Sequence, residues 1–312
     1  MSRQNNFNLT RRNFMKSVSA AVCGTMPASS GHSALGSRIG KKTHQKFNIN
    51  VYDRMYDGHR PKGCTTIAVE YADWPGNEFG LWLPEGIRVN GKTMWGNWKE
   101  DGRHQDFTLD SQGRLTWKYS KESFQLISTL TPDEKNSCLW YRHAFRNKSD
   151  KPLSKLSTQT CFHLVNAPQF ISIRGERLWA CLDGQWTTTD KVPRHESPDP
   201  RRIGFLKEGV RSERTVIKIK SFPSATMAET AHHPLFIAES FGAAASVGVA
   251  SRNFLSLFNN NDYILRCIHS EPFPIEKLMP GETAAQESVI LFCKGNHKVL
   301  LEQFEKLKLR YW

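Results

Sequence analysis

The stretch that decides the fold lies near the C-terminus, where residues 266–292 read RCIHSEPFPIEKLMPGETAAQESVILF. Residues 263–269 and 287–292 are two short apolar segments at the ends of this stretch. Between them lies the pair Pro280-Gly281, and such pairs favour tight turns. Two short apolar segments separated by a turn predict two β-strands.

Working outward, short apolar segments of the same kind recur at intervals of about 8 to 12 residues along the chain. Asn90-Gly91 separates two of them, and an Asn-Gly pair favours a two-residue hairpin. Over residues 297–310, apolar side chains instead recur at helical spacing among Lys and Glu. The pattern predicts an all-β antiparallel sandwich with one C-terminal helix, in a single domain over residues 49–312.

Three short segments resemble galactose mutarotase-like (aldose 1-epimerase-like) proteins. Residues 278–283 (LMPGET), followed by ILF at 290–292, resemble that family's Leu-x-Pro-Gly-Glu turn and the strand after it. Residues 267–271 (CIHSE) stand where the family has Cys-Leu-Glu-Thr-Gln, and residues 159–164 (QTCFHL) resemble its His-x-Tyr-Phe-Asn-Leu strand. The resemblance implies an antiparallel β-supersandwich and a carbohydrate-related function.

The same resemblance shows where this sequence departs from the family at its catalytic positions. The general-acid His of the family falls on Gln159, its general-base Glu falls on His269, and His163 stands in place of an Asn. The resemblance therefore implies a reaction other than ordinary mutarotation. The fold also carries polysaccharide lyases, glycosidase domains and non-catalytic sugar binders, so it does not by itself select a chemistry.

Three residues are the candidates for proton transfer. His titrates near neutrality and can act as an acid or a base, as ring opening or lyase chemistry on a sugar requires. Glu271 follows His269 by two positions, so on a strand both side chains lie on one face. The alternative is that each His is hydrogen-bonded inside a sheet. The predicted catalytic residues are His163, His269 and Glu271.

Residues 166–186, NAPQFISIRGERLWACLDGQW, are rich in Arg, Trp and acidic side chains. Tryptophan rings stack on the apolar faces of sugars, and Arg binds carboxylates or sulfates through two parallel hydrogen bonds. The alternative is that the Trp side chains fill the core while the charges face water. The predicted substrate-binding residues are Asn166, Arg174, Glu176, Arg177, Trp179, Asp183 and Trp186.

The N-terminus carries a different kind of motif. Residues 10–16 read TRRNFMK and precede an uncharged, modestly apolar run over 17–35. This arrangement resembles a twin-arginine (Tat) export signal, Ser/Thr-Arg-Arg-x-Phe-Leu-Lys, with only Met15 departing from the pattern. The residues that match the core of the motif are Arg11, Arg12 and Phe14.

The motif predicts a signal peptide over residues 1–36, followed by a polar linker over 37–48. The Tat export machinery is then a partner, and the mature protein is periplasmic or extracellular. The apolar run is too short and too rich in Ser, Gly and Ala to span a membrane stably, so no membrane span is expected after cleavage.

Composition narrows the remaining functions. The formal net charge is +13, but the basic residues are scattered and no nucleic-acid-binding signature occurs, so no nucleic-acid partner is expected. Six cysteines follow the signal without zinc-finger spacing, and no Gly-rich phosphate loop occurs, so neither a metal nor a cofactor is predicted. The leading hypothesis is an exported carbohydrate-active protein using acid–base chemistry, epimerase- or lyase-like. The alternative is a non-catalytic carbohydrate-binding or structural envelope protein.

Overall fold

The computed structural model describes residues 41–43, 46–52, 65–96, 105–192, 202–210, 225–261 and 266–311. The chain divides into two units, Met1–Leu35 and Gly36–Trp312, and every described residue belongs to the second. The predicted signal residues Arg11, Arg12 and Phe14 lie outside the described residues. The fold below is that of the second unit.

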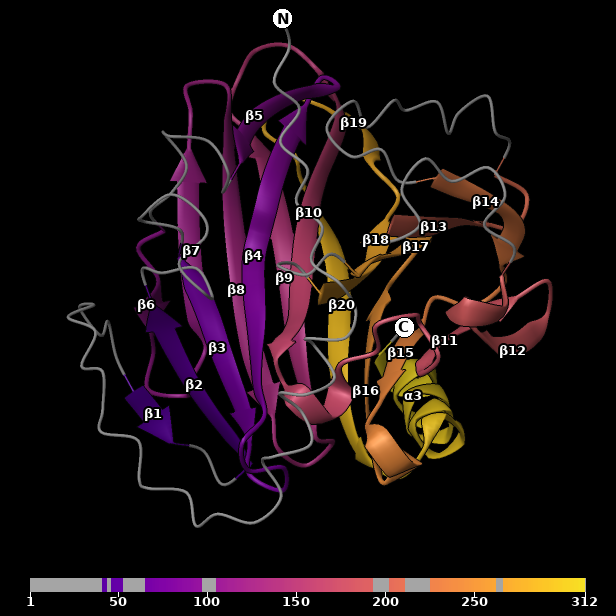
Figure 1. Ribbon diagram of the computed structural model, residues 1–312. Helices are drawn as coiled ribbons and strands as arrows, with labels where there is room; N and C mark the ends of the chain where they lie inside the picture. Colours follow the sequence, from indigo (N-terminus) through magenta and orange to yellow (C-terminus); the bar gives the residue numbers. More distant parts are fainter. Residues whose placement is uncertain are drawn as a thin grey trace, which may run out of the picture. The chain divides into compact units, whose positions relative to one another are not determined.

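Two layers of β-strands make up this unit, and the first contains both strands of the predicted proton-transfer site (Figure 1). Neighbours in this layer pair antiparallel, except for the last two, which are parallel. In spatial order they are β1 (Lys41–Thr43), β2 (Phe47–Tyr52), β3 (Thr66–Tyr71), β4 (Glu78–Val89), β10 (Leu153–Asn166), β18 (Arg266–Pro272), β17 (Phe254–Asn261), β13 (Arg202–Lys207) and β14 (Ala225–Ala231). Two short strands, β5 (Lys92–Gly96) and β19 (Ile275–Leu278), pair with β4 and β10.

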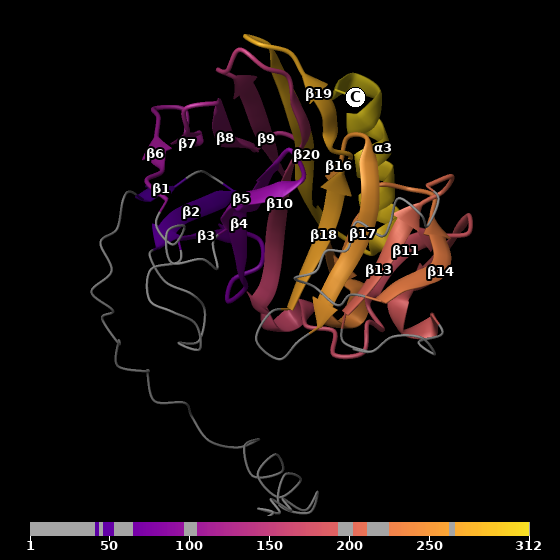
Figure 2. The same cartoon turned by 90° about the horizontal axis from the view of Figure 1, so that it is seen from above.

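The second layer is antiparallel throughout. Its strands, in spatial order, are β6 (Thr108–Leu109), β7 (Leu115–Ser120), β8 (Phe124–Asp133), β9 (Cys138–Asn147), β20 (Thr283–Lys294), β16 (Ala245–Ser251), β15 (Phe236–Glu239), β11 (Leu178–Leu182) and β12 (Gln185–Thr188). β14 also pairs with β11, so the two layers meet at one edge. Figure 2 shows the two layers from above.

Apolar side chains from both layers meet between them and form the main core. Phe79 of β4 and Phe162 of β10 stack with ring centroids 5.5 Å apart, and Phe292 of β20 lies 5.5 Å from Phe79. Because side chains alternate along a strand, burying Phe162 and Ile268 in this core turns their neighbours to the outer face of the first layer. That alternation is what positions the candidate site.

A single α-helix occurs among the described residues, α3 (His297–Tyr311), as predicted over 297–310. Its first turn is capped by Asn296, whose Oδ1 accepts from the backbone N–H of Lys298 at 3.1 Å. Leu300 and Phe304 of the helix pack against residues of the second layer such as Leu291. Figure 2 shows the helix lying along the outer face of this layer. The predicted antiparallel all-β sandwich with one C-terminal helix is thus confirmed.

The predicted linker over residues 37–48 differs from the structure. Strand β1 lies within it, and β2 begins at Phe47. β1 pairs antiparallel with β2, Lys41 opposite Asn50. An edge strand is held by backbone hydrogen bonds on one side and tolerates Lys, so it lacks the apolar alternation that marks a strand in sequence.

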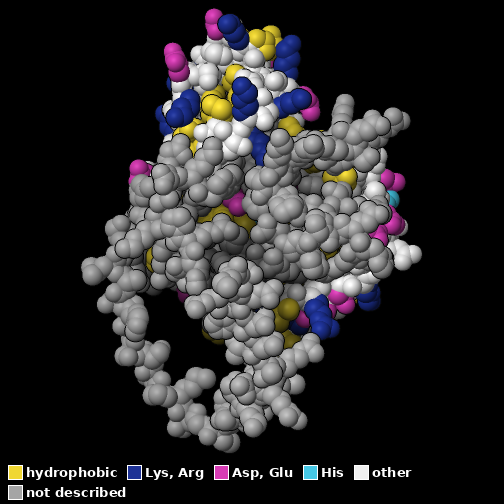
Figure 3. Space-filling model, turned by 45° about the horizontal axis from the view of Figure 1, so that its top comes forward, with side chains coloured by type: hydrophobic (Ala, Val, Ile, Leu, Met, Phe, Trp, Pro, Cys, Tyr) yellow, Lys and Arg dark blue, Asp and Glu magenta, His cyan; other side chains and the backbone are white. Residues whose placement is uncertain are grey.

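Three further observations concern possible membrane spans, the surface charge and the cysteines of the described part. No helix of the described part is both long enough and apolar enough to cross a membrane. In the described part at the top of the view in Figure 3, Lys and Arg side chains are mixed with Asp and Glu. Among the described residues the cysteines are thiols, with no disulfide, and all are buried.

Candidate functional site

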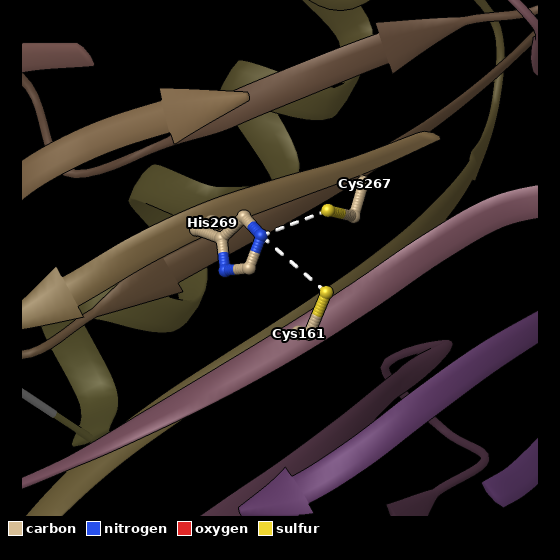
Figure 4. A group of neighbouring side chains, drawn as sticks. All are labelled: Cys161, Cys267 and His269. Carbon is tan, nitrogen blue, oxygen red and sulfur yellow. Dashed lines mark hydrogen bonds between the residues drawn. The ribbon is translucent and has the colours of Figure 1, made fainter. Parts of the chain in front are cut away.

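The pairing of β10 with β18 brings two segments that are far apart in sequence onto one surface. Phe162 is opposite Ile268, and His163 is opposite Cys267. Since Phe162 and Ile268 point into the core, Cys161, His163, Cys267 and His269 project together from the outer face of the first layer. Figure 4 shows three of these side chains, Cys161, Cys267 and His269, turned toward one another. A β-bulge in β10 shifts the register of its pairing with β4 between Gln159 and Cys161, next to this group.

His269 is the centre of the group and is only 2% exposed. Its Nε2 lies 3.0 Å from the Cys267 Sγ and 3.4 Å from the Cys161 Sγ. Its other nitrogen, Nδ1, lies 2.9 Å from the backbone oxygen of Thr160, which can only accept, so Nδ1 carries a proton. The ring also stacks on Phe258 of β17 at 3.7 Å, and these contacts fix its orientation.

His269 and Cys267 each shift the pKa of the other. Burial by itself lowers the pKa of His269, but the Cys267 thiolate, Glu85 and Glu271 raise it above its ordinary value. Burial raises the pKa of Cys267, but the bond from Cys161 and the charge of His269 lower it below the ordinary value. Each of the two side chains therefore favours the charged form of the other, against the cost of burial.

A carboxylate follows on the same face. Glu271 is partly exposed, and its Oε2 accepts from the Ser256 hydroxyl at 3.3 Å. Desolvation raises the pKa of the Glu271 carboxyl, while His269, Arg88 and the Ser256 bond act in the opposite direction. The predicted approach of His269 to Glu271 is therefore present, with Arg88 of β4 as an additional cation.

Sequence reasoning missed a second carboxylate. Glu85 of β4 is buried, accepts a hydrogen bond from the Gln159 amide at 2.8 Å, and acts on the charge of His269. Gln159 itself is partly exposed. A lone Glu beside Pro84 carries no motif, so only the pairing of β4 with β10 reveals it.

His163 lies on the same face but in a different environment. It is 1% exposed, its ring meets Trp82 edge to face at 4.2 Å, and its Nδ1 lies 3.9 Å from the Cys161 Sγ. The Trp82 indole in turn donates to Thr66 at 3.1 Å. Burial at this depth keeps His163 from direct contact with a dissolved sugar in this conformation.

Some of the predicted substrate-binding residues make contacts within their own loop, and others lie beside α3. The Glu176 carboxylate accepts from Ser172 at 2.9 Å and from the Arg174 backbone at 2.9 Å, and it pairs with Arg177 at 3.4 Å. Arg177 also donates to the Ile171 backbone oxygen. Asn166, at the end of β10, donates to Glu78 at 3.2 Å.

The remaining three lie on the β11–β12 hairpin. Trp179 stacks on His297 of α3 at 3.7 Å and donates to Glu239 at 2.8 Å, and Trp186 lies 5.3 Å from His233. Asp183, in the hairpin turn, accepts from Thr230 at 2.9 Å. Both Trp side chains pack with the second layer under α3, whereas His163 and His269 belong to the outer face of the first layer. The structure does not bring the two predicted groups together.

Comparisons with known proteins find solved structures of similar fold at low sequence identity. No protein-family model matches the chain, and no curated protein matches it. An α-galactosidase from Lactobacillus brevis is 9% identical with a TM-score of 0.47, covering 86% of this chain and 41% of that one. The galactose mutarotase related enzyme from Lactobacillus acidophilus is 12% identical, with a TM-score of 0.44 and coverage of 83% and 99%. A galactose mutarotase-like protein from Lactobacillus casei is 12% identical, with a TM-score of 0.45 and coverage of 81% and 99%.

Proposed function

We propose that this chain is an exported protein that acts on a carbohydrate by proton transfer, at the outer face of β4, β10, β17 and β18. The observation that carries the proposal is the group on this face formed by two carboxylates and a cation, Glu85, Glu271 and Arg88, around His269. Epimerase- or lyase-like chemistry needs a proton to be taken from the sugar and a proton to be given back. Glu271 can do both in turn, and Glu85 stays buried behind it.

The roles follow from exposure and bonding. Glu271 is the partly exposed carboxylate, so it is the group that contacts the substrate and takes the proton. Arg88, also partly exposed, would neutralise a uronic acid carboxylate, and Gln159 would orient a sugar hydroxyl. Glu85 and His269 are buried behind them and act as positioning groups. The scattered positive charge of the chain suits an acidic polysaccharide.

A second candidate function is carbohydrate binding without turnover. The observation that favours it is the burial of His163 and His269, at 1% and 2% exposure, since neither can meet a sugar directly in this conformation. The two functions share one binding face, and turnover distinguishes them.

The test compares two Glu variants on a panel of aldoses and uronate polysaccharides. Interconversion of anomers is followed by NMR, and lyase products by their ultraviolet absorbance. We expect Glu271→Gln to lower turnover by about 100-fold or more, because it removes the group that takes the proton. The matched control is Glu287→Gln, a partly exposed residue of β20 paired with Arg252, which should keep wild-type turnover.

Three outcomes are distinct. Full turnover by Glu271→Gln refutes its catalytic role. Thermal stabilisation by a glycan without any product assigns the protein to the binding class. No response of any kind across the panel leaves the structural role in the envelope as the remaining reading.

Export is tested separately. Replacing Arg11 and Arg12 together by Lys should retain the protein in the cytoplasm, measured by cell fractionation, because the Tat pattern requires the paired arginines. Unchanged export of the double variant contradicts the Tat assignment.

A further inference from the structure

The group at the β10–β18 pairing contains the ligand types of a metal site. Cys161, Cys267 and His269 each offer one ligand atom, and these three atoms all lie within 4.8 Å of one another (Figure 4). All three residues are buried, at 2%, 3% and 2% exposure. We propose that these side chains bind a single zinc-type transition-metal ion on the outer face of the first layer, next to Glu271.

The distances match tetrahedral coordination. With zinc–sulfur bonds of about 2.3 Å and zinc–nitrogen bonds of about 2.0 Å, a tetrahedral ion holds N and S about 3.5 Å apart. The observed separations from the His269 Nε2 are 3.4 Å to Cys161 and 3.0 Å to Cys267. An ion at this point requires an outward shift of no more than about 0.5 Å between Nε2 and the second sulfur.

The orientation of His269 is that of a metal ligand. Because Nδ1 donates its proton to the Thr160 backbone oxygen at 2.9 Å, the neutral ring presents the Nε2 lone pair to the two sulfurs. A hydrogen bond from the non-ligating nitrogen to a backbone carbonyl is the usual support of a metal-bound His. Phe258, stacked on the ring, blocks rotation and excludes water on that side.

A disulfide between the same cysteines fits the sheet less well. The register places Cys267 opposite His163, so Cys161 and Cys267 are diagonal neighbours across the strand pair. Diagonal positions are about 7–8 Å apart, beyond the Cα separation that most disulfides adopt. A bridging ion spans two sulfurs about 3.8 Å apart and needs no such approach of the backbones.

Three ligands leave a fourth position. His163 reaches it only if its ring shifts, because its Nδ1 lies 3.9 Å from the Cys161 Sγ but is not among the ligand atoms that lie within 4.8 Å of one another. Filling by His163 would close the site as a Cys2His2 structural centre, whereas its exclusion would leave the position open next to Glu271. This proposal departs from the expectation of no metal drawn from sequence spacing.

The test uses the full chain purified after growth with added zinc. Metal content is measured by mass spectrometry, and Co²⁺ replacement is followed by near-ultraviolet absorbance, where thiolate-to-cobalt bands report sulfur ligation. We expect about one ion per chain and a thiolate band in the wild type. Cys161→Ser and Cys267→Ser should each weaken the band and lower the metal content several-fold.

The control variant is Cys293→Ser, a buried thiol in the cluster under α3, which should retain both the ion and the band. Wild-type protein without stoichiometric metal and without a cobalt band overturns the proposal, whatever the folding of the variants. An intact-mass measurement showing a Cys161–Cys267 disulfide, or rapid alkylation of Cys267 in protein exposed to zinc, overturns it as well.

The readouts are independent of the proposed sugar chemistry. Glu271→Gln should keep the cobalt band, because its carboxylate is not among the three ligands. His163→Ala tests the fourth position: a change in the intensity of the visible cobalt bands supports ligation by His163, and an unchanged spectrum supports the open three-ligand site. Loss of the metal with retained turnover would separate the ion from the sugar reaction.

Discussion

His143 of β9 provides a stability prediction that can be worked from the structure. Its ring is 2% exposed and lies between the layers, with Nδ1 2.9 Å from the Ser128 hydroxyl and Nε2 2.8 Å from the Thr160 hydroxyl. Burial lowers the pKa of His143 to about 3. In the unfolded chain the pKa of His is about 6.5, so between these values the unfolded state binds more protons.

The sign and size follow from this difference. Above about pH 6.5 the His143 ring is neutral in both states and costs no stability. As the pH falls from there toward about 3, the unfolded state takes up a proton that the folded state does not, and the free energy of unfolding decreases. At about pH 5 the loss is (6.5 − 5) × 1.36, or about 2 kcal/mol, relative to neutral pH. Replacing His143 by Gln removes the titrating ring, so the variant should lose about 2 kcal/mol less than the wild type over the same interval.

Urea denaturation at about pH 7 and about pH 5 measures this difference, because other groups that titrate are common to both proteins. A destabilised but non-titrating variant, Gly248→Ala, serves as the control and should keep the wild-type dependence on pH. The reasoning is refuted if His143→Gln and the wild type lose the same free energy of unfolding on acidification. That result would mean that His143 is protonated in the folded protein without cost.

Three further predictions concern packing and the region of α3. Gly248→Ala should lower the free energy of unfolding by about 1–3 kcal/mol in a denaturation experiment, because its Cβ would lie 2.9 Å from Leu235 and 3.0 Å from Leu300; an unchanged value would mean that α3 shifts freely. Phe292→Ala should cost about 3–5 kcal/mol, since the ring of this second-layer residue meets Phe47 and Phe79 of the first layer across the core and is 1% exposed; a loss below about 1 kcal/mol would contradict its place in the core. Trp179→Phe removes the hydrogen bond to the buried Glu239 and should cost about 1–3 kcal/mol without changing glycan affinity. A loss of glycan affinity at unchanged stability would instead restore the ligand role predicted from its sequence.

Much of the fold could be predicted because its causes are local. Apolar spacing predicts the C-terminal helix to within one residue of its observed end, because this spacing acts within a few positions, as does the Asn296 cap that the structure shows. Strand β1 could not be predicted as a strand, because it forms through backbone pairing of Lys41 with Asn50 and not through a pattern of its own side chains.

The candidate site was predicted only in part. His269 and Glu271 were placed on one face by the period of a single strand, and the structure agrees. Glu85 was missed because it reaches His269 from another strand. Trp179 and Trp186 were grouped with Arg174 by their nearness in sequence, yet the hairpin places both Trp side chains against the region of α3.

What the sequence by itself determined is whatever depends on neighbours a few residues away: the strands and turns, the helix, the sandwich class and the likeness of residues 10–16 to an export signal. The tertiary structure alone decided which distant side chains meet. Cys161 and His269 are 108 positions apart and lie 3.4 Å from each other only because β10 pairs with β18 in one register. A shift of that register by one residue would turn the side chains of one strand to the opposite face, so the site depends on pairing that no local pattern encodes.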